Sequence, residues 1–248
     1  MKNQAMVIAA ALDLYFRGLS LRKISEHLET LYRVKVSYTS IHYWLSKYVE
    51  LVHIFVQGLR VKTGERWHAD DSLIRLRGRH AVIWTLLDSK SRFLIGQHIS
   101  RKRSSKEAST LLKIGRARAQ TSQNEVLELV TDGLPSYAVA LERELAPGEA
   151  FQRVIHIQGP LTGLVNNNKI ERLYGTFKER TKLTLHFNNE GGAELFAKGF
   201  TTYYNFVRGH MALNGRTPAE AAGLSKRKLS WLDLISEASS KGRHKRVG

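Results

Sequence analysis

Hydrophobic side chains recur at helical spacing through the first fifty residues of the chain. Ile8 and Leu12 share one face of a first predicted helix, and Ile24 and Leu28 share one face of a second. A third helix is predicted over residues 37–48, with its apolar residues again on one side. Three short helices joined by tight turns are typical of a helix-turn-helix module. The alternative is a three-helix bundle that packs or dimerises.

From residue 65 the pattern changes to the short apolar runs of β-strands. Three runs joined by short turns predict an antiparallel meander over residues 65–76, 81–88 and 92–100. Helices and strands then alternate, with helices expected at 104–120 and 135–145, strands at 126–132 and 149–157, and further helices at 168–186 and 194–215. Strand–helix–strand units imply parallel pairing, so the sheet should be mixed and five-stranded. This order is that of a ribonuclease H-like α/β domain.

These patterns divide the chain into four parts. We expect an all-α helix-turn-helix domain at 1–50, a helical linker at 51–64, a ribonuclease H-like domain at 65–224 and a basic tail at 225–248. The last eight residues, KGRHKRVG, are expected to be disordered because they are polar and strongly charged.

The charge of the chain changes the picture most. It has 39 Lys and Arg against 22 Asp and Glu, a formal net charge of +17 over 248 residues. A protein this basic usually binds a polyanion, and double-stranded DNA is the expected partner. No run of 18 apolar residues and no signal-peptide pattern points to a membrane. The absence of cysteine excludes disulfides and thiolate zinc sites, and it fits a cytoplasmic protein.

Three acidic residues fall where a two-metal site would need them. Asp70 ends one strand-like run, Asp132 follows another, and Glu171 opens a long basic helix. The first and fourth strands are neighbours in this fold, so Asp70 and Asp132 should lie side by side, and the last helix can deliver Glu171. Two Mg²⁺ ions about 4 Å apart would then serve an in-line phosphoryl displacement, with Mn²⁺ as a possible substitute.

Each acid also has an ordinary interpretation. Asp132 alone fits a turn before a glycine, and Glu171 alone fits a helix surface. Asp70 and Asp71 should point to opposite faces of their strand, so only one can be a ligand. We expect Asp70 to be the ligand, with Asp71 either solvated or facing the N-terminal part of the chain. Glu179 is a rival third acid but lies about 80° around the helix from Glu171.

Two helices carry the residues expected to touch DNA. The third N-terminal helix exposes a polar set, namely Thr39, Ser40, His42, Tyr43 and Lys47. On the long helix, Lys178 lies seven residues after Glu171 and therefore on nearly the same face, Asn168 precedes Glu171 by about one turn, and Lys182 continues the stripe. The alternative for this helix is an ordinary solvated, charged face.

Four motifs resemble those of a known family. The runs WHADDS (67–72), TDG (131–133) and NNNKIERL (166–173) are similar to the catalytic signature of DDE transposases. The block YNFVRGHMALNGRTPAE (204–220) resembles the C-terminal signature of insertion-sequence transposases and integrases. The resemblance as a whole runs from about residue 8 to residue 224. With the N-terminal helix-turn-helix and the Trp67-x-x-Asp70 spacing, the chain most resembles the insertion-sequence-six group of bacterial and archaeal transposases.

The resemblance implies a function and a set of roles. Asp70, Asp132 and Glu171 would be the metal ligands, and Lys178 would contact transposon-end DNA. The enzyme would cleave to free a 3′-hydroxyl at the element's end, and that hydroxyl would attack target DNA directly. Family members work as dimers or larger assemblies, the group forms cointegrates, and the setting would be the nucleoid of a prokaryotic cytoplasm. Asp71 stands where the group often has Glu, and Gly209 replaces a common proline.

Two other functions use the same features. A non-catalytic, sequence-specific DNA-binding regulator derived from a transposase would need only residues 5–48. A structure-selective nuclease would need only the ribonuclease H-like domain. The presence of all three acids favours the enzyme over the regulator, and the N-terminal helices favour a sequence-specific DNA substrate over the nuclease.

Overall fold

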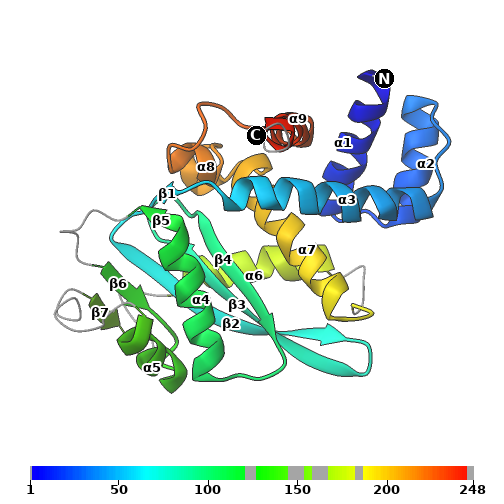
Figure 1. The fold of residues 1–248 in the computed structure, drawn as a ribbon. Helices are drawn as coiled ribbons and strands as arrows, with labels where there is room; N and C mark the ends of the chain where they lie inside the picture. Colours follow the sequence, from blue (N-terminus) through cyan, green and yellow to red (C-terminus); the bar gives the residue numbers. More distant parts are fainter. Residues whose placement is uncertain (1, 121–126, 145–153, 158–166, 182–186, 245–248) are drawn as a thin grey trace.

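The computed structural model describes residues 2–120, 127–144, 154–157, 167–181 and 187–244 (Figure 1). Its centre is a five-stranded sheet, with an all-helical group beside it that is built from both ends of the chain. Within the described ranges, no helix is both long and apolar enough to cross a membrane.

The sheet has the order β4-β3-β2-β6-β7. Its strands are β2 (Arg66–Leu76), β3 (Arg79–Asp88), β4 (Leu94–Ser100), β6 (Leu127–Val130) and β7 (Val154–Ile157). The first three pair antiparallel, while β6 pairs parallel with β2 and β7 parallel with β6. The expected mixed sheet is confirmed, and β2 and β6 are neighbours, with His68 opposite Val130.

Helices cover both faces of the sheet. The helices that accompany the sheet are α4 (Ser105–Arg118), α5 (Pro135–Glu144), α6 (Asn168–Thr181) and α7 (Glu190–Thr202). On one face, Gly115 of α4 packs so closely on Trp67 and Leu86 that an added Cβ would lie 2.3 Å from Leu86. On the other face, Tyr174 of α6 donates a hydrogen bond to the carbonyl oxygen of Asp70. Successive residues of β2 therefore face different helices.

Short elements complete this part of the chain. A two-stranded parallel pair joins β1 (Val61–Lys62) to β5 (Ala119–Gln120). After α7 come a π-helical turn (Tyr203–Val207), a 3₁₀ turn (Met211–Leu213) and α8 (Pro218–Ala221). Thr217 and Glu220 form a reciprocal capping box at the start of α8.

The three expected N-terminal helices are α1 (Lys2–Phe16), α2 (Leu21–Tyr32) and α3 (Tyr38–Gln57). Ser20 and Ser37 cap α2 and α3, each accepting a hydrogen bond from a backbone N–H three residues on. Helix α3 is 20 residues long, so the first part of the expected 51–64 linker is a continuation of this helix.

The expectation of a basic tail at 225–248 is corrected. Residues Trp231–His244 form a helix, α9, and Lys241 to His244 of the segment expected to be disordered belong to it. The ring of Trp231 stacks on Phe16 of α1 with centroids 5.3 Å apart, and Leu234 and Ile235 are buried. An apolar face hidden among basic residues therefore ties the C-terminal segment into the core.

Candidate active site

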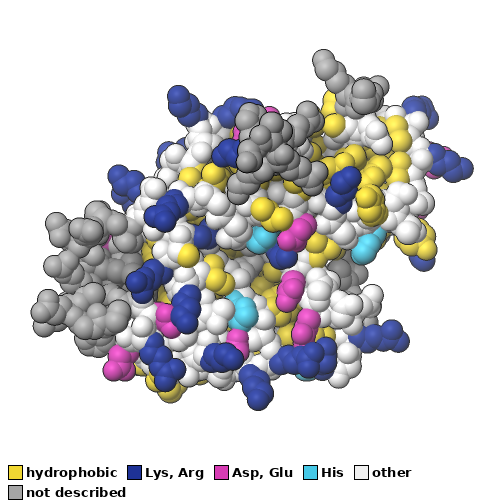
Figure 2. All heavy atoms as spheres, in the orientation of Figure 1, with side chains coloured by type: hydrophobic (Ala, Val, Ile, Leu, Met, Phe, Trp, Pro, Cys, Tyr) yellow, Lys and Arg dark blue, Asp and Glu magenta, His cyan; other side chains and the backbone are white. Residues whose placement is uncertain are grey.

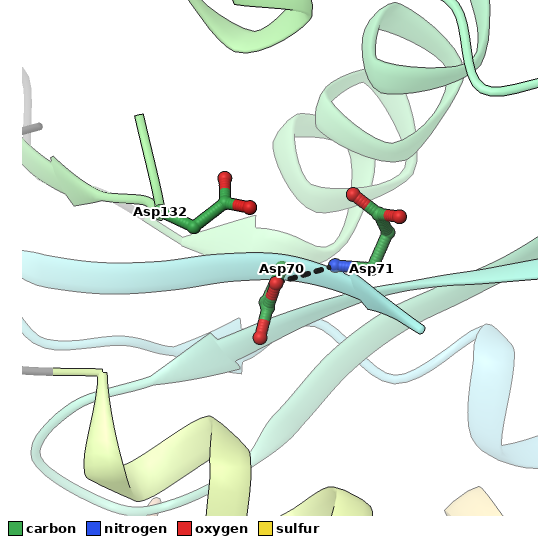
Figure 3. Close-up of side chains that lie close together, drawn as sticks. All are labelled: Asp70, Asp71 and Asp132. Carbon is green, nitrogen blue, oxygen red and sulfur yellow. Dashed lines mark hydrogen bonds between the residues drawn. The ribbon is translucent and has the colours of Figure 1, made fainter. Parts of the chain in front are cut away.

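Asp70 lies in the middle of β2, on the face covered by α6. One carboxylate oxygen accepts a hydrogen bond from the backbone N–H of Asp71 at 2.8 Å (Figure 3). Burial raises the pKa of Asp70 to about 7, and the nearby charges of Asp132, Asp71 and Glu171 also raise it. No cationic side chain within the described ranges pairs with Asp70. A divalent cation would supply a countercharge to this carboxylate.

Asp132 lies two residues after the end of β6, the strand next to β2. Val130, the last residue of β6, pairs with His68 of β2, which lies two residues before Asp70. One oxygen of Asp132 accepts from the N–H of Leu134 at 3.1 Å, so the side chain also stabilises the turn before α5. Asp70, Asp71 and Asp132 each place a carboxylate oxygen within 4.8 Å of the others. Hard oxygen donors at this spacing suit Mg²⁺ or Mn²⁺.

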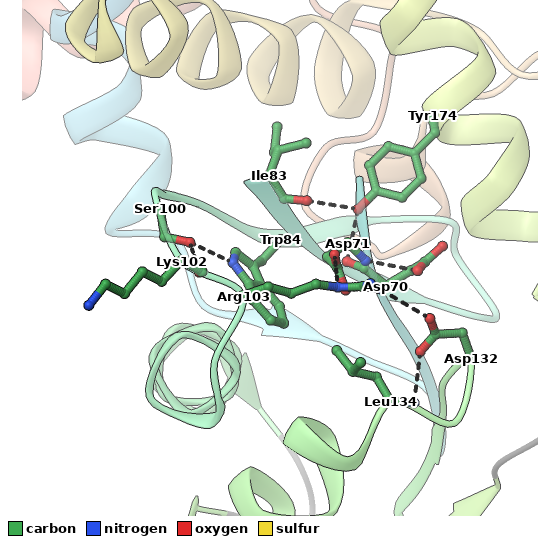
Figure 4. Close-up of polar contacts among 10 residues, drawn as sticks. All are labelled: Asp70, Asp71, Ile83, Trp84, Ser100, Lys102, Arg103, Asp132, Leu134 and Tyr174. Carbon is green, nitrogen blue, oxygen red and sulfur yellow. Dashed lines mark hydrogen bonds and ion pairs between the residues drawn. The ribbon is translucent and has the colours of Figure 1, made fainter. Parts of the chain in front are cut away.

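Asp71 is not the solvated group that its sequence position predicts. Its side chain is only 4% exposed, and Arg103 holds both of its oxygens, at 2.8 Å and 3.1 Å (Figure 4). The same guanidinium reaches Asp132 at 3.5 Å. Asp71 is therefore already neutralised by a bidentate arginine, whereas Asp70 is not.

Arg103 is a site residue that the sequence analysis missed. It lies in the loop between β4 and α4, which a chain of hydrogen bonds fixes: the indole of Trp84 donates to Ser100, and Ser100 donates to the carbonyl of Lys102 (Figure 4). The basic run at 101–103 was the available signal, but nothing in its spacing links it to an acid 32 residues away.

Glu171 lies in the first turn of α6 and is exposed. It is not among the three carboxylates that converge within 4.8 Å, although its charge contributes to the raised pKa of Asp70. The helix that carries it is clamped to the sheet three residues further on. There the hydroxyl of Tyr174 donates to the carbonyl oxygens of Asp70 at 2.8 Å and Ile83 at 3.2 Å.

A second anchor holds the beginning of α6. The ring of His68 lies 3.2 Å from the amide oxygen of Asn167 and 3.3 Å from the hydroxyl of Ser89. Lys169 donates to the same hydroxyl at 2.6 Å. Burial lowers the pKa of His68 to about 4, so the ring is neutral and acts as a structural link. Sequence periodicity gave no sign of this network.

The residues expected to contact DNA are solvent-facing. Lys178 and Asn168 are exposed on α6, while Lys182 lies outside the described residues. On α3 the exposed side chains are Thr39, His42, Tyr43 and Lys47, and Ser40 is half-buried beside its cap. Figure 2 shows Lys and Arg side chains spread widely over the visible face of the molecule, with acidic side chains interspersed among them.

The strand order is that of a ribonuclease H-like domain, and acids from β2 and from the segment after β6 come together on it. A family model described as a DDE domain, that of the IS240 transposases, matches residues 64–210. The chain belongs to this family, whose members are polynucleotidyl transferases. The family is consistent with the insertion-sequence-six group that the motifs resemble. No sequence among curated proteins matches the chain.

Solved structures of similar fold include two retroviral integrase catalytic cores. That of BIV integrase is 15% identical with a TM-score of 0.44, over 65% of this chain and 95% of that one. That of HTLV-2 integrase with magnesium is 18% identical with a TM-score of 0.44, over 66% and 99%. A chain of the simian T-cell lymphotropic virus intasome is 14% identical with a TM-score of 0.45; the match covers 66% of this chain but only 56% of that one.

Proposed function

We propose that this protein is the transposase of an insertion sequence. It binds the ends of its element, cleaves there to free a 3′-hydroxyl, and joins that hydroxyl to target DNA. The observation that carries the proposal is the close approach of Asp70 and Asp132 from adjacent strands of a DDE domain.

Asp70, Asp132 and Glu171 are the proposed catalytic and metal-binding residues. They would hold two Mg²⁺ ions, with Mn²⁺ as a substitute, and the metal would supply Lewis-acid stabilisation of the attacking and leaving oxygens. Asp70 is preferred over Asp71 because its carboxylate has no cationic partner and senses the charge of Glu171. Arg103 pairs with Asp71 on the side of the strand away from α6. Its positive charge also limits the repulsion between Asp71 and Asp132.

Two surfaces are proposed to hold the element's end. Exposed residues of α3 would enter the major groove: Thr39, Ser40, His42, Tyr43 and Lys47. Lys178 and Lys182, with Asn168, would hold the phosphate backbone close to Glu171. The working form would be a homodimer or larger assembly because two ends must be joined together. It would act on the nucleoid of a prokaryotic cytoplasm and form cointegrates.

A strand-transfer assay tests the proposal. Purified protein is incubated with Mg²⁺, a supercoiled plasmid and a labelled oligonucleotide from the sequence flanking the gene, in parallel with the Asp70→Asn variant. We expect joined product with the wild type and none with the variant, while both bind the oligonucleotide. Binding without cleavage by the wild type would favour the regulator. Cleavage of any branched DNA without joining would favour the nuclease.

A further inference from the structure

A basic groove runs beside the first part of α6. Four cationic side chains line it: Arg92 from the β3–β4 turn, Lys169 and Arg172 from α6, and Arg208 from the segment after the π-helical turn. The hollow has a volume of about 210 Å³, and Tyr204 and Met211 complete its walls. No acidic residue is among those that line it.

The cations of this groove are not neutralised. Elsewhere on the surface Arg101 pairs with Glu190 and Arg227 pairs with Asp233. Within the described ranges, none of the four groove cations forms an ion pair. Burial lowers the pKa of Arg92, and the neighbouring charge of Arg172 lowers it further. Like charges held this close without counterions favour an anionic ligand.

The walls of the groove are rigid. Arg208 follows the π-helical turn and donates its N–H to the carbonyl of Tyr203 at 2.8 Å. Beyond it, Gly209 passes so close to Gly215 that an added Cβ would lie 2.5 Å from a carbonyl oxygen. The ring of His210 packs edge-on against Tyr204, with centroids 4.5 Å apart. The spacing of the cations is therefore set by the fold and not by flexible loops alone.

The groove and the N-terminal helices lie toward different ends of α6. Lys169, Arg172 and Thr176 follow one another at helical spacing along the first part of the helix and line the groove. At the other end, the guanidinium of Arg180 donates to the carbonyl of Arg17, in the turn after α1. Lys178 lies on nearly the same face as Glu171, about 120° around the helix from Arg172. Strand transfer needs a second DNA duplex, and the groove offers it phosphate-binding cations away from the N-terminal helices.

We propose that the basic groove binds the phosphate backbone of target DNA, while the element's end is held on the Lys178 side of Glu171. The inference rests on the proposed transposase function. Phosphate contacts of this kind position a duplex without reading its sequence, as an indiscriminate target site requires. Arg172 and Arg208 are the residues to test, because they reach the groove from separate elements.

The first test measures binding and needs no catalysis. The double variant Arg172→Ala/Arg208→Ala is compared with Lys226→Ala/Lys228→Ala, which removes two exposed cations outside the groove. A labelled duplex without any end sequence is titrated at several salt concentrations. We expect the groove variant to lower the slope of log K against log salt by about 2, and the control variant to leave it near the wild-type value. Equal slopes for the groove variant and the wild type would overturn the inference.

The second test separates the target from the element's end. In the strand-transfer assay, the ratio of joined to cleaved product should fall about tenfold for the groove variant relative to the control. An equal fall in cleavage and joining would show that the groove serves the element's end, and the inference would be wrong. If the wild type cleaves and joins nothing, the proposed function fails, while the binding test still decides whether the groove holds duplex DNA.

Discussion

Asp70 and Asp71 are neighbours in sequence with different surroundings. Alternation along β2 turns Asp70 toward α6 and Asp71 toward the loop before α4, where Arg103 engages both of its oxygens. A carboxylate that already has a bidentate arginine has little to gain from a metal, whereas a carboxylate surrounded by other acids gains much. The sequence predicts the alternation but not the arginine.

We therefore predict different outcomes for the two asparagine variants. Asp70→Asn should reduce cleavage by on the order of 1,000-fold or more, because loss of metal stabilisation costs several kcal/mol. Asp71→Asn should retain most of the activity and lose about 1 kcal/mol of stability with the Arg103 pair. Single-turnover cleavage and thermal unfolding measure the two effects, and a larger loss of cleavage in Asp71→Asn would reverse the assignment.

Metal binding gives a second check at the same residues. Mg²⁺ should raise the melting temperature of the wild type, because an ion that binds only the folded state stabilises it by mass action. The shift should be lost in Asp132→Asn and preserved in Glu179→Gln, whose carboxylate lies elsewhere on α6. A Mg²⁺-dependent shift of equal size in Asp132→Asn would remove Asp132 from the ligand set.

At the scale of elements, one hydroxyl of α6 bonds directly to the backbone of β2 and β3. Tyr174 donates to two carbonyl oxygens of the sheet, one of them belonging to Asp70. Tyr174→Phe keeps the ring and should cost about 1 to 2 kcal/mol of stability. Because Glu171 lies one turn earlier, cleavage should fall about tenfold to a hundredfold at a temperature where the variant is fully folded. Unchanged cleavage would mean that α6 holds Glu171 in place without this clamp.

The C-terminal helix shows where the sequence misled. The basic residues of 241–248 suggested a tail, but Trp231, Leu234 and Ile235 form an apolar face that packs on α1 and α3. Trp231→Ala should destabilise the protein by about 3 to 5 kcal/mol. Denaturant unfolding measures the loss, and Lys226→Ala, on an exposed site nearby, is the control. A loss of unfolding free energy below 1 kcal/mol would mean that α9 contributes little to the core and behaves as a tail.

The strands were easier to predict than the links between them. Each strand of the sheet shows its own apolar run, and the order of elements was sufficient to place Asp70 beside Asp132. Local patterns carry no information on contacts such as those from His68 to Asn167, from Arg103 to Asp71, or from Arg172 to the groove. Such contacts join residues distant in sequence and have no periodicity of their own.

At the scale of the whole molecule, the N-terminal helices pack directly against the elements around the sheet. Phe16 of α1 lies against Gly199 of α7 so closely that an added Cβ would meet its ring at 2.0 Å. Lys198 of α7 also pairs with Glu50 of α3 at 2.8 Å. One hydrophobic core runs from α1 through the sheet to α9. The division into four domains stays a prediction, but the described helices of both ends share that core.

This shared core fixes the distance between the N-terminal helices and the active site. A flexible tether would let the active site search along DNA for a scissile bond. If α3 reads the element's end as proposed, a shared core instead holds the active site at one fixed distance and one fixed rotation from the bases that α3 contacts. Each extra base pair between the recognised bases and the terminal nucleotide moves the scissile phosphate by about 3.4 Å and turns it by about 34°. Ends lengthened by one or two base pairs should therefore be bound normally but cut at the displaced position.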